Sequence, residues 1–255
     1  AKIARTGWGW GCAAEDFDND GDLDLFVANG HLSGKSARDY CTTYWCHDVY
    51  EGDSNANTLL KTFFNRQFKG GIGHSISWNG YEHNAFFLNQ GDGDDFLGAG
   101  FLLGVAGEFD SRAVLPDDQD GDGRVDLLVV EYDTKTSGQR IHVYRNEWPD
   151  AGNWIGIRPR GTAIGAKVTV KAGDRTWMRC LVTGESFAAQ KANVVRFGLG
   201  DLKKAEYAEV RRLPRGPNTP EDRPGGLGEE EVQERVPGAD LVLVSILGPR
   251  SVVGI

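Results

Sequence analysis

Short stretches of alternating apolar and polar residues, separated by glycine-rich turns, recur along most of the chain. Before residue 150 they include residues 23–28, 125–130 and 141–144, and each is followed by a polar or glycine-containing turn. After residue 153 the same pattern continues in four more stretches, at residues 154–157, 166–171, 176–182 and 194–197. Apolar runs of this length between glycine turns are typical of β-strands. The pattern predicts an all-β protein.

One segment type occurs twice. An apolar approach, an Asp-rich loop and an apolar strand form one unit, and its loop begins at Asp16 and again at Asp118, 102 residues later. Each copy predicts two strands joined by the loop, which places the acidic residues at the tip of a β-hairpin. A second phrase, an alternating strand that ends in asparagine and a turn, closes each copy at residues 85–93 and 141–147.

Both Asp-rich loops, the first at residues 16–24 and the second at residues 118–126, follow the pattern D-x-D-x-D-G-x-x-D. Carboxylates stand at positions 1, 3, 5 and 9, and position 7 offers its main-chain carbonyl. The expected ligands are Asp16, Asp18, Asp20, Asp22 (carbonyl) and Asp24 in the first loop, and Asp118, Asp120, Asp122, Arg124 (carbonyl) and Asp126 in the second. Gly21 and Gly123 occupy position 6, where a sharp turn favours a residue without Cβ.

Oxygen-only ligands in this alternation indicate a hard cation, and calcium accepts the roughly 6–8 oxygens that such a loop offers. We therefore expect two calcium sites. An EF-hand would place a glutamate at position 12, but Val27 and Val129 stand there and the flanks are strand-like, so that class is excluded. A solvated acidic turn without an ion is the alternative interpretation.

The net charge of −9 is concentrated in these loops, since they contain nine aspartates. Without them the chain would be formally neutral. No dense basic stripe occurs, so nucleic acid is not an expected partner. No apolar run approaches the roughly 20 residues that span a bilayer, so no membrane span is expected.

A break at residues 149–152 divides the chain into two expected domains, residues 1–150 and 151–255. The first copy of the repeat is long, and we expect an insertion in it at about residues 31–81. The second domain contains a Pro-, Gly- and Glu-rich stretch at about residues 215–238, which predicts a loop before a last strand at residues 241–247.

The insertion contains two close cysteines, Cys41 and Cys46, followed by His47. A local disulfide is the simpler interpretation, and the even total of four cysteines, with Cys12 and Cys180, is consistent with oxidising surroundings. The alternative is attachment of haem c, although the usual site has two residues between its cysteines and this one has four.

The Asp-rich loops resemble FG-GAP/VCBS repeats, which build integrin α-subunit propellers and occur in many secreted bacterial proteins. The similarity lies at residues 16–21 and 118–126. Residues 153–212 resemble the ASPIC/UnbV domain that follows such repeats in cartilage acidic protein-like and bacterial chains, through the phrases at residues 153–157, 163–170 and 197–201. The Cys41/Cys46 insertion has no counterpart in integrin repeats.

The resemblance implies a partial β-propeller followed by a small β-sandwich-like domain. Because about 4–8 blades close a propeller, it also implies that another chain, or an N-terminal fragment of a processed precursor, supplies the remaining blades. The expected function is a calcium-stabilised, extracytoplasmic (periplasmic, secreted or cell-surface) module for protein binding or assembly, without a recognisable catalytic motif.

Two other functions stay open. A redox enzyme or enzyme subunit would use haem or a transition metal in the Cys/His insertion, with further histidines at 31, 74, 83 and 142. A carbohydrate-binding protein would stack sugars on tryptophans, of which the candidates are Trp8, Trp10, Trp45 and Trp78. Core packing is the alternative for both sets.

Overall fold

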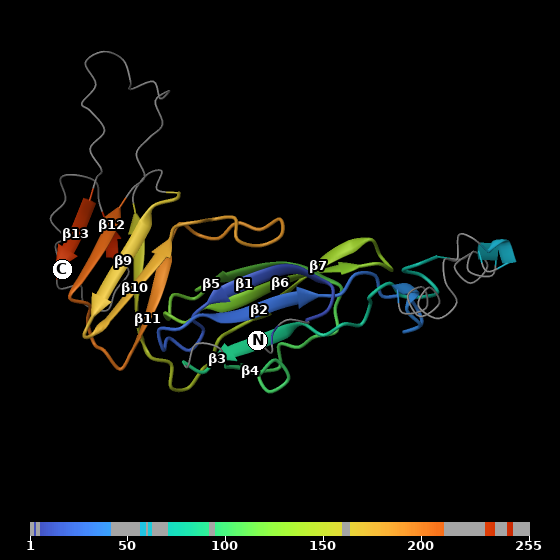
Figure 1. Cartoon of the computed structure of the whole chain (residues 1–255), viewed down its shortest axis with the longest axis horizontal. Helices are drawn as coiled ribbons and strands as arrows, with labels where there is room; N and C mark the ends of the chain where they lie inside the picture. The colour runs from blue at the N-terminus through green and yellow to red at the C-terminus, as the bar shows by residue number, and fades with distance from the viewer. Residues whose placement is uncertain are drawn as a thin grey trace, which may run out of the picture.

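The computed structural model describes residues 3, 6–41, 57–59, 61–62, 71–91, 95–159, 164–211, 233–237 and 244–246. In this part of the chain, strands in four sheets make up almost all of the regular structure (Figure 1). The all-β prediction is confirmed. No helix among the described residues has the length and apolar character needed to cross a bilayer.

The N-terminal half consists of two antiparallel meanders, in which strands adjacent in sequence are also adjacent in space. The first sheet contains β1 (Gly9–Glu15), β2 (Asp24–Asn29), β3 (Ala85–Asn89) and β4 (Phe96–Gly98), and the second contains β5 (Ser111–Asp117), β6 (Asp126–Asp133) and β7 (Gly138–Tyr144). Strand β1 contacts β5, so the two sheets meet at their first strands.

One apolar core holds these two sheets together. Phe26 of β2, Val114 of β5 and Val129 of β6 are completely buried in it, and Phe17 and Phe86 pack edge to face with ring centroids 5.2 Å apart. The alternation of buried and exposed positions along β1 and β2 explains why one face of the first sheet is apolar.

The predicted insertion leaves the first sheet between β2 and β3. Its described ends are joined to each other by isolated bridges between Leu32 and Trp78 and between Asp39 and Ser77. In Figure 1 these described ends lie at the end of the sheet opposite the C-terminal domain. The insertion is thus anchored by its two ends and does not interrupt the pairing of β2 with β3.

The C-terminal domain is formed by two sheets that face each other. One has the order β10-β9-β12-β13 and the other β11-β8-β14. The bounds are β8 (Asn153–Pro159), β9 (Lys167–Ala172), β10 (Arg175–Cys180), β11 (Val195–Gly200), β12 (Tyr207–Arg211), β13 (Gln233–Pro237) and β14 (Val244–Ile246). Ile157 of β8, Val170 of β9 and Phe197 of β11 share one buried core, which is the arrangement of a β-sandwich.

Two strands, β13 and β14, lie in the region where the sequence predicts a loop and a last strand. Residues 233–237 fall inside the stretch expected to be a loop, but they form β13, because their main chain pairs antiparallel with the whole length of β12. Strand β14 lies within the predicted last strand at residues 241–247 and pairs in parallel with β8.

Candidate metal centre

The two Asp-rich loops lie at the tips of hairpins, as their sequence predicts. Glu15 pairs with Asp24 at the end of β1 and β2, and Asp117 pairs with Asp126 at the end of β5 and β6. The two loops also share a main-chain conformation at position 6, where φ is positive: 99° at Gly21 and 89° at Gly123. A Cβ is unfavourable there, which explains the glycine in both copies.

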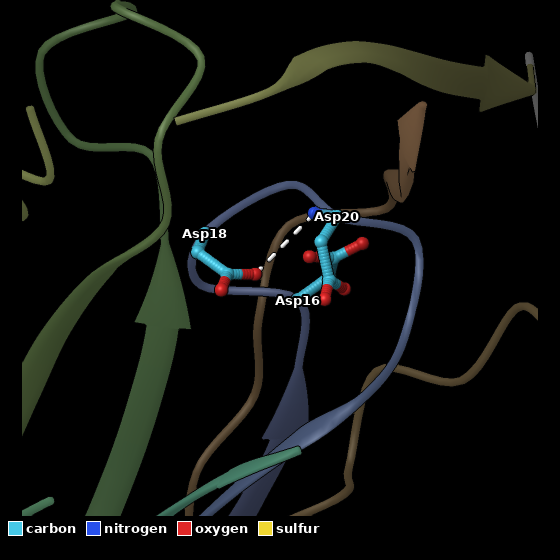
Figure 2. Close-up of side chains that lie close together, drawn as sticks. All are labelled: Asp16, Asp18 and Asp20. Carbon is cyan, nitrogen blue, oxygen red and sulfur yellow. Dashed lines mark hydrogen bonds between the residues drawn. The ribbon is translucent and has the colours of Figure 1, made fainter. Parts of the chain in front are cut away.

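In the first loop, three carboxylates gather around one point. One oxygen each from Asp16, Asp18 and Asp20 lies within 4.8 Å of the others, and Figure 2 shows the three side chains on the same turn. Oxygens bound to one calcium ion at about 2.3–2.6 Å are at most about 5 Å apart. The spacing therefore fits a single hard cation.

Asp16 is the most enclosed of these groups, with only 3% of its surface exposed. Its Oδ2 atom accepts hydrogen bonds from the N–H groups of Gly21 (2.9 Å) and Gly198 (3.0 Å), whereas its buried Oδ1 atom has no hydrogen-bond partner. Burial raises the pKa of Asp16 to about 7, partly opposed by Arg179. A buried carboxylate oxygen without a donor is costly, and a bound cation would remove that cost.

The aspartates at position 9 of the two loops accept hydrogen bonds from main-chain N–H groups. Asp24 accepts hydrogen bonds from the N–H groups of Phe17 (3.0 Å) and Asn89 (2.8 Å), one on each oxygen. Asp126 repeats this arrangement with Gln119 (2.9 Å) and Asn146 (2.7 Å). Burial raises the pKa of Asp24 to about 8 despite its two donors. Each carboxylate oxygen keeps a second lone pair, so these groups can bind a cation as well.

An asparagine at or just after the end of the third strand of each sheet bonds to the loop: Asn89 is the last residue of β3, and Asn146 lies two residues after β7. The Nδ2 atom of Asn89 donates to the carbonyl of Leu23 (3.2 Å), and that of Asn146 donates to the carbonyl of Val125 (3.1 Å). Both carbonyls are at position 8 of their loop. The sequence carries the signal for this role in the recurring strand that ends in asparagine, although the pattern alone does not connect it to the loops.

The second loop is more open and has cationic partners. Asp118, Asp120 and Asp126 each place one oxygen within 4.8 Å of the others. Arg145 forms an ion pair of 2.8 Å with Asp120, and Arg124 binds Asp122. The hydrogen bond from Arg124 lowers the pKa of Asp122. In the first loop Asp22 has a comparable partner, Arg175, at 3.1 Å.

The predicted Cys/His site is only partly described. Cys41 has a free thiol and accepts a hydrogen bond from Nε1 of Trp78 at 3.0 Å. Cys46 and His47 lie outside the described residues, so the disulfide and the haem attachment both stay predictions. Cys12 and Cys180 are exposed free thiols.

Three of the four candidate tryptophans pack around the ring of His31. The ring of His31 stacks on Trp8 at 5.1 Å, and it meets Trp10 at 5.4 Å and Trp78 at 4.8 Å. Trp45 lies outside the described residues. His142 instead bonds Glu131 (2.7 Å), and His83 lies beside Glu108 (3.4 Å). The described histidines at 31, 83 and 142 therefore occupy separate surroundings.

Comparison with known proteins agrees with the C-terminal part of this picture. Residues 156–211 match the family model described as ASPIC and UnbV. Cartilage acidic protein 1 of Xenopus tropicalis is 27% identical over 219 residues, which is 75% of this chain and 32% of the relative. Cartilage acidic protein 1 of Mus musculus is 26% identical over 220 residues, with the same coverage. The chain thus spans about a third of the length of the curated relatives it matches.

Proposed function

We propose that this chain is a calcium-binding, extracytoplasmic module for protein binding or assembly. The observation that carries the proposal is Asp16: its carboxylate lies in a cluster with those of Asp18 and Asp20, and its buried Oδ1 atom has no hydrogen-bond partner. A divalent ion there would compensate three negative charges that otherwise repel one another.

Calcium fits these loops better than softer metals do. All side-chain ligands are carboxylates, and no cysteine or histidine belongs to either described cluster. Oxygen-only sets favour hard cations, and the irregular loop suits calcium, since magnesium requires near-octahedral geometry. We assign the first ion to Asp16, Asp18, Asp20, Asp24 and the carbonyl of Asp22, and the second to Asp118, Asp120, Asp122, Asp126 and the carbonyl of Arg124.

The two N-terminal sheets are proposed to be propeller blades of the FG-GAP/VCBS type. Support comes from their meander order, the contact between β1 and β5, and the same loop at the same place in each sheet. Repetition of one unit side by side is how a propeller is built.

Further blades, from another chain or an N-terminal fragment, are the proposed partner. Ile141 and Val143 on the edge strand β7 are 63% and 64% exposed, and Leu102 is 83% exposed. An apolar cavity of about 560 Å³ lies nearby and is lined by Leu102, Leu127 and Tyr144 among others. Exposed apolar surface next to such a cavity is typical of an interface. The similarity to cartilage acidic protein 1 supports an extracytoplasmic location.

Metal analysis combined with thermal unfolding tests this proposal. We expect two calcium ions per chain after dialysis against calcium, and a lower Tm in excess EGTA, because the ions bind only the folded loops. Magnesium at the same concentration should restore less of the Tm. An unchanged melting curve in EGTA would contradict calcium binding, and stoichiometric iron or copper would favour the redox alternative.

A further inference from the structure

The first loop is also the main contact between the two domains. Four consecutive carbonyls, those of residues 18 to 21, accept hydrogen bonds from the C-terminal domain. The donors are the N–H groups of Gly152 (to Asp18, 2.8 Å) and Gly200 (to Asn19, 2.8 Å), Nη1 of Arg175 (to Asp20, 2.8 Å) and Nε1 of Trp177 (to Gly21, 2.8 Å). The loop therefore serves as a docking surface for that domain.

The first loop directs its carboxylates toward one point and its main-chain carbonyls toward the C-terminal domain. Asp16, Asp18 and Asp20 converge on one point, while the carbonyls of residues 18 to 21 are bound by the other domain. The left-handed conformation of Asn19 (φ 59°) and Gly21 (φ 99°) is part of this arrangement. Because one main-chain conformation serves both purposes, whatever stabilises the carboxylate cluster also stabilises the docking surface.

Asp16 connects the cluster to the C-terminal domain directly. Its Oδ2 atom accepts the N–H of Gly198, and its Oδ1 atom is the buried oxygen without a partner. The two domains approach so closely here that a Cβ on Gly198 would lie 2.2 Å from Oδ2 of Asp16. Only glycine allows this contact.

The second loop contacts the C-terminal domain by packing: a Cβ on Gly123 would lie 1.8 Å from Nε1 of Trp154. Its carbonyl at position 6, that of Gly123, accepts a hydrogen bond from Nδ2 of Asn19 in the first loop (3.3 Å). Among the described residues, no hydrogen bond joins the second loop to residues 153–211. The two loops share a sequence pattern, but the first binds the C-terminal domain through main-chain hydrogen bonds and the second meets it by side-chain packing.

We infer that the cation of the first loop fastens the C-terminal domain to the N-terminal sheets, and that the cation of the second loop does not. This inference rests on the proposed calcium binding. Calcium binding and domain docking are then coupled at the first loop, and we call this coupling the joint. Calcium favours docking, and by reciprocity docking raises the calcium affinity of this loop by the same factor.

Amide hydrogen exchange in the full chain, measured by NMR, tests the joint. The N–H groups of Gly198 and Gly200 donate hydrogen bonds across the interface, so their protection reports docking. We expect exchange to be at least about tenfold faster in EGTA than in calcium. The amide of Val170, in the core of the C-terminal domain, should be unaffected and serves as the internal reference.

Matched variants separate the two loops. Asp18→Asn and Asp120→Asn change the same position of each loop, and each should lower the calcium stoichiometry by one. Asp18→Asn should expose the Gly198 and Gly200 amides even in calcium, whereas Asp120→Asn should leave them protected. The Asp18 carboxylate accepts a hydrogen bond from within its own loop, so an effect on docking would have to act through the loop.

A variant on the other side tests reciprocity. Gly198→Ala should weaken calcium binding at the first loop by about tenfold and leave the second loop unchanged. Gly184→Ala is the control, because a Cβ there meets nothing within 4 Å. If both ions bind but EGTA leaves the interface amides protected, the joint is refuted while calcium binding stands. If no calcium binds at all, the proposed function fails first and the joint fails with it.

Discussion

The N–H of Gly198 donates a hydrogen bond of 3.0 Å to Oδ2 of Asp16, across the boundary between the two domains. Asp16 is thus at once a buried carboxylate of the first loop and a direct contact of strand β11. Its neighbour Glu15 reaches the same domain through Lys191 and Arg179. The acidic hairpin tip is therefore an interior element of the molecule, although acidic loops are usually solvated.

The position 9 aspartate should stabilise the fold even without calcium. Asp24→Ala removes the acceptor of two N–H groups, the buried one of Phe17 and the half-buried one of Asn89, so we expect a loss of about 2–4 kcal/mol in the free energy of unfolding in EGTA. Asp20→Ala should have little effect in EGTA, since among the described residues its carboxylate accepts only the N–H of Asp22, but it should destabilise the protein in calcium. Urea unfolding in the two buffers measures both. Equal effects of both variants in EGTA would contradict this division of roles.

The metal-free protein should lose stability as the pH rises. Burial raises the pKa of Asp16 to about 7 and that of Asp24 to about 8, well above the ordinary range of an aspartate. Between the ordinary and the raised pKa the folded state binds more protons than the unfolded state, so the free energy of unfolding falls with increasing pH. We expect a fall of at least about 1.4 kcal/mol between pH 5 and 8 in EGTA, which corresponds to one pKa unit.

The control for this pH effect is a double variant, Asp16→Asn with Asp24→Asn, which cannot titrate at these positions. Subtracting its pH profile removes the opposing contribution of His31, whose pKa is lowered by burial. Saturating calcium should flatten the wild-type profile, because the ion keeps both carboxylates charged. A difference profile in EGTA that is flat, or that rises with pH, would be inconsistent with the burial of these groups.

The parts of this architecture that depend on neighbouring residues could be predicted from the sequence. The alternation of Asp and the glycines at 21 and 123 specify the hairpin tips, because their hydrogen bonds and positive φ angles are local. The division near residue 150 is predicted from a change in the strand and turn pattern, and strand β8 begins at Asn153.

The difference between the two loops could not be predicted, because it depends on contacts across the chain. Arg175 and Trp177 meet the first loop from more than 150 residues away. No sequence pattern connects those residues to the loop. The Asp-rich pattern is the same in both loops, so it does not predict that the first is buried and the second exposed. Likewise β13 is specified by pairing with β12 and not by its own Pro-, Gly- and Glu-rich surroundings.

Arg145 should compete with calcium at the second loop. Its guanidinium lies 2.8 Å from Asp120 and 3.8 Å from Asp122, where a cation would otherwise be bound. Arg145→Ala should therefore raise the calcium affinity of this loop by a few-fold, roughly the 0.2–1 kcal/mol typical of exposed ion pairs. Calorimetric titration measures the effect. Arg140→Ala is the control, since Arg140 pairs with Asp133 and not with the loop; an equal change in both variants would point to overall charge instead.

The buried ion pairs beside the first loop should matter more than exposed ones of the same type. Glu15 is 6% exposed and lies 2.6 Å from Lys191 and 3.2 Å from Arg179, and its removal would leave two largely buried cations without this partner. We expect Glu15→Gln to cost about 2–4 kcal/mol of unfolding free energy, because an uncompensated buried charge is strongly unfavourable.

Glu206→Gln provides the comparison for Glu15, because Glu206 pairs with Lys171 at 2.7 Å but both side chains are substantially exposed. An exposed pair contributes at most about 1 kcal/mol, so this variant should unfold nearly like the wild type. Urea unfolding in saturating calcium measures both variants under conditions in which the first loop is held by its ion. Equal losses would mean that water reaches Glu15, and the boundary between the domains would then be open rather than packed.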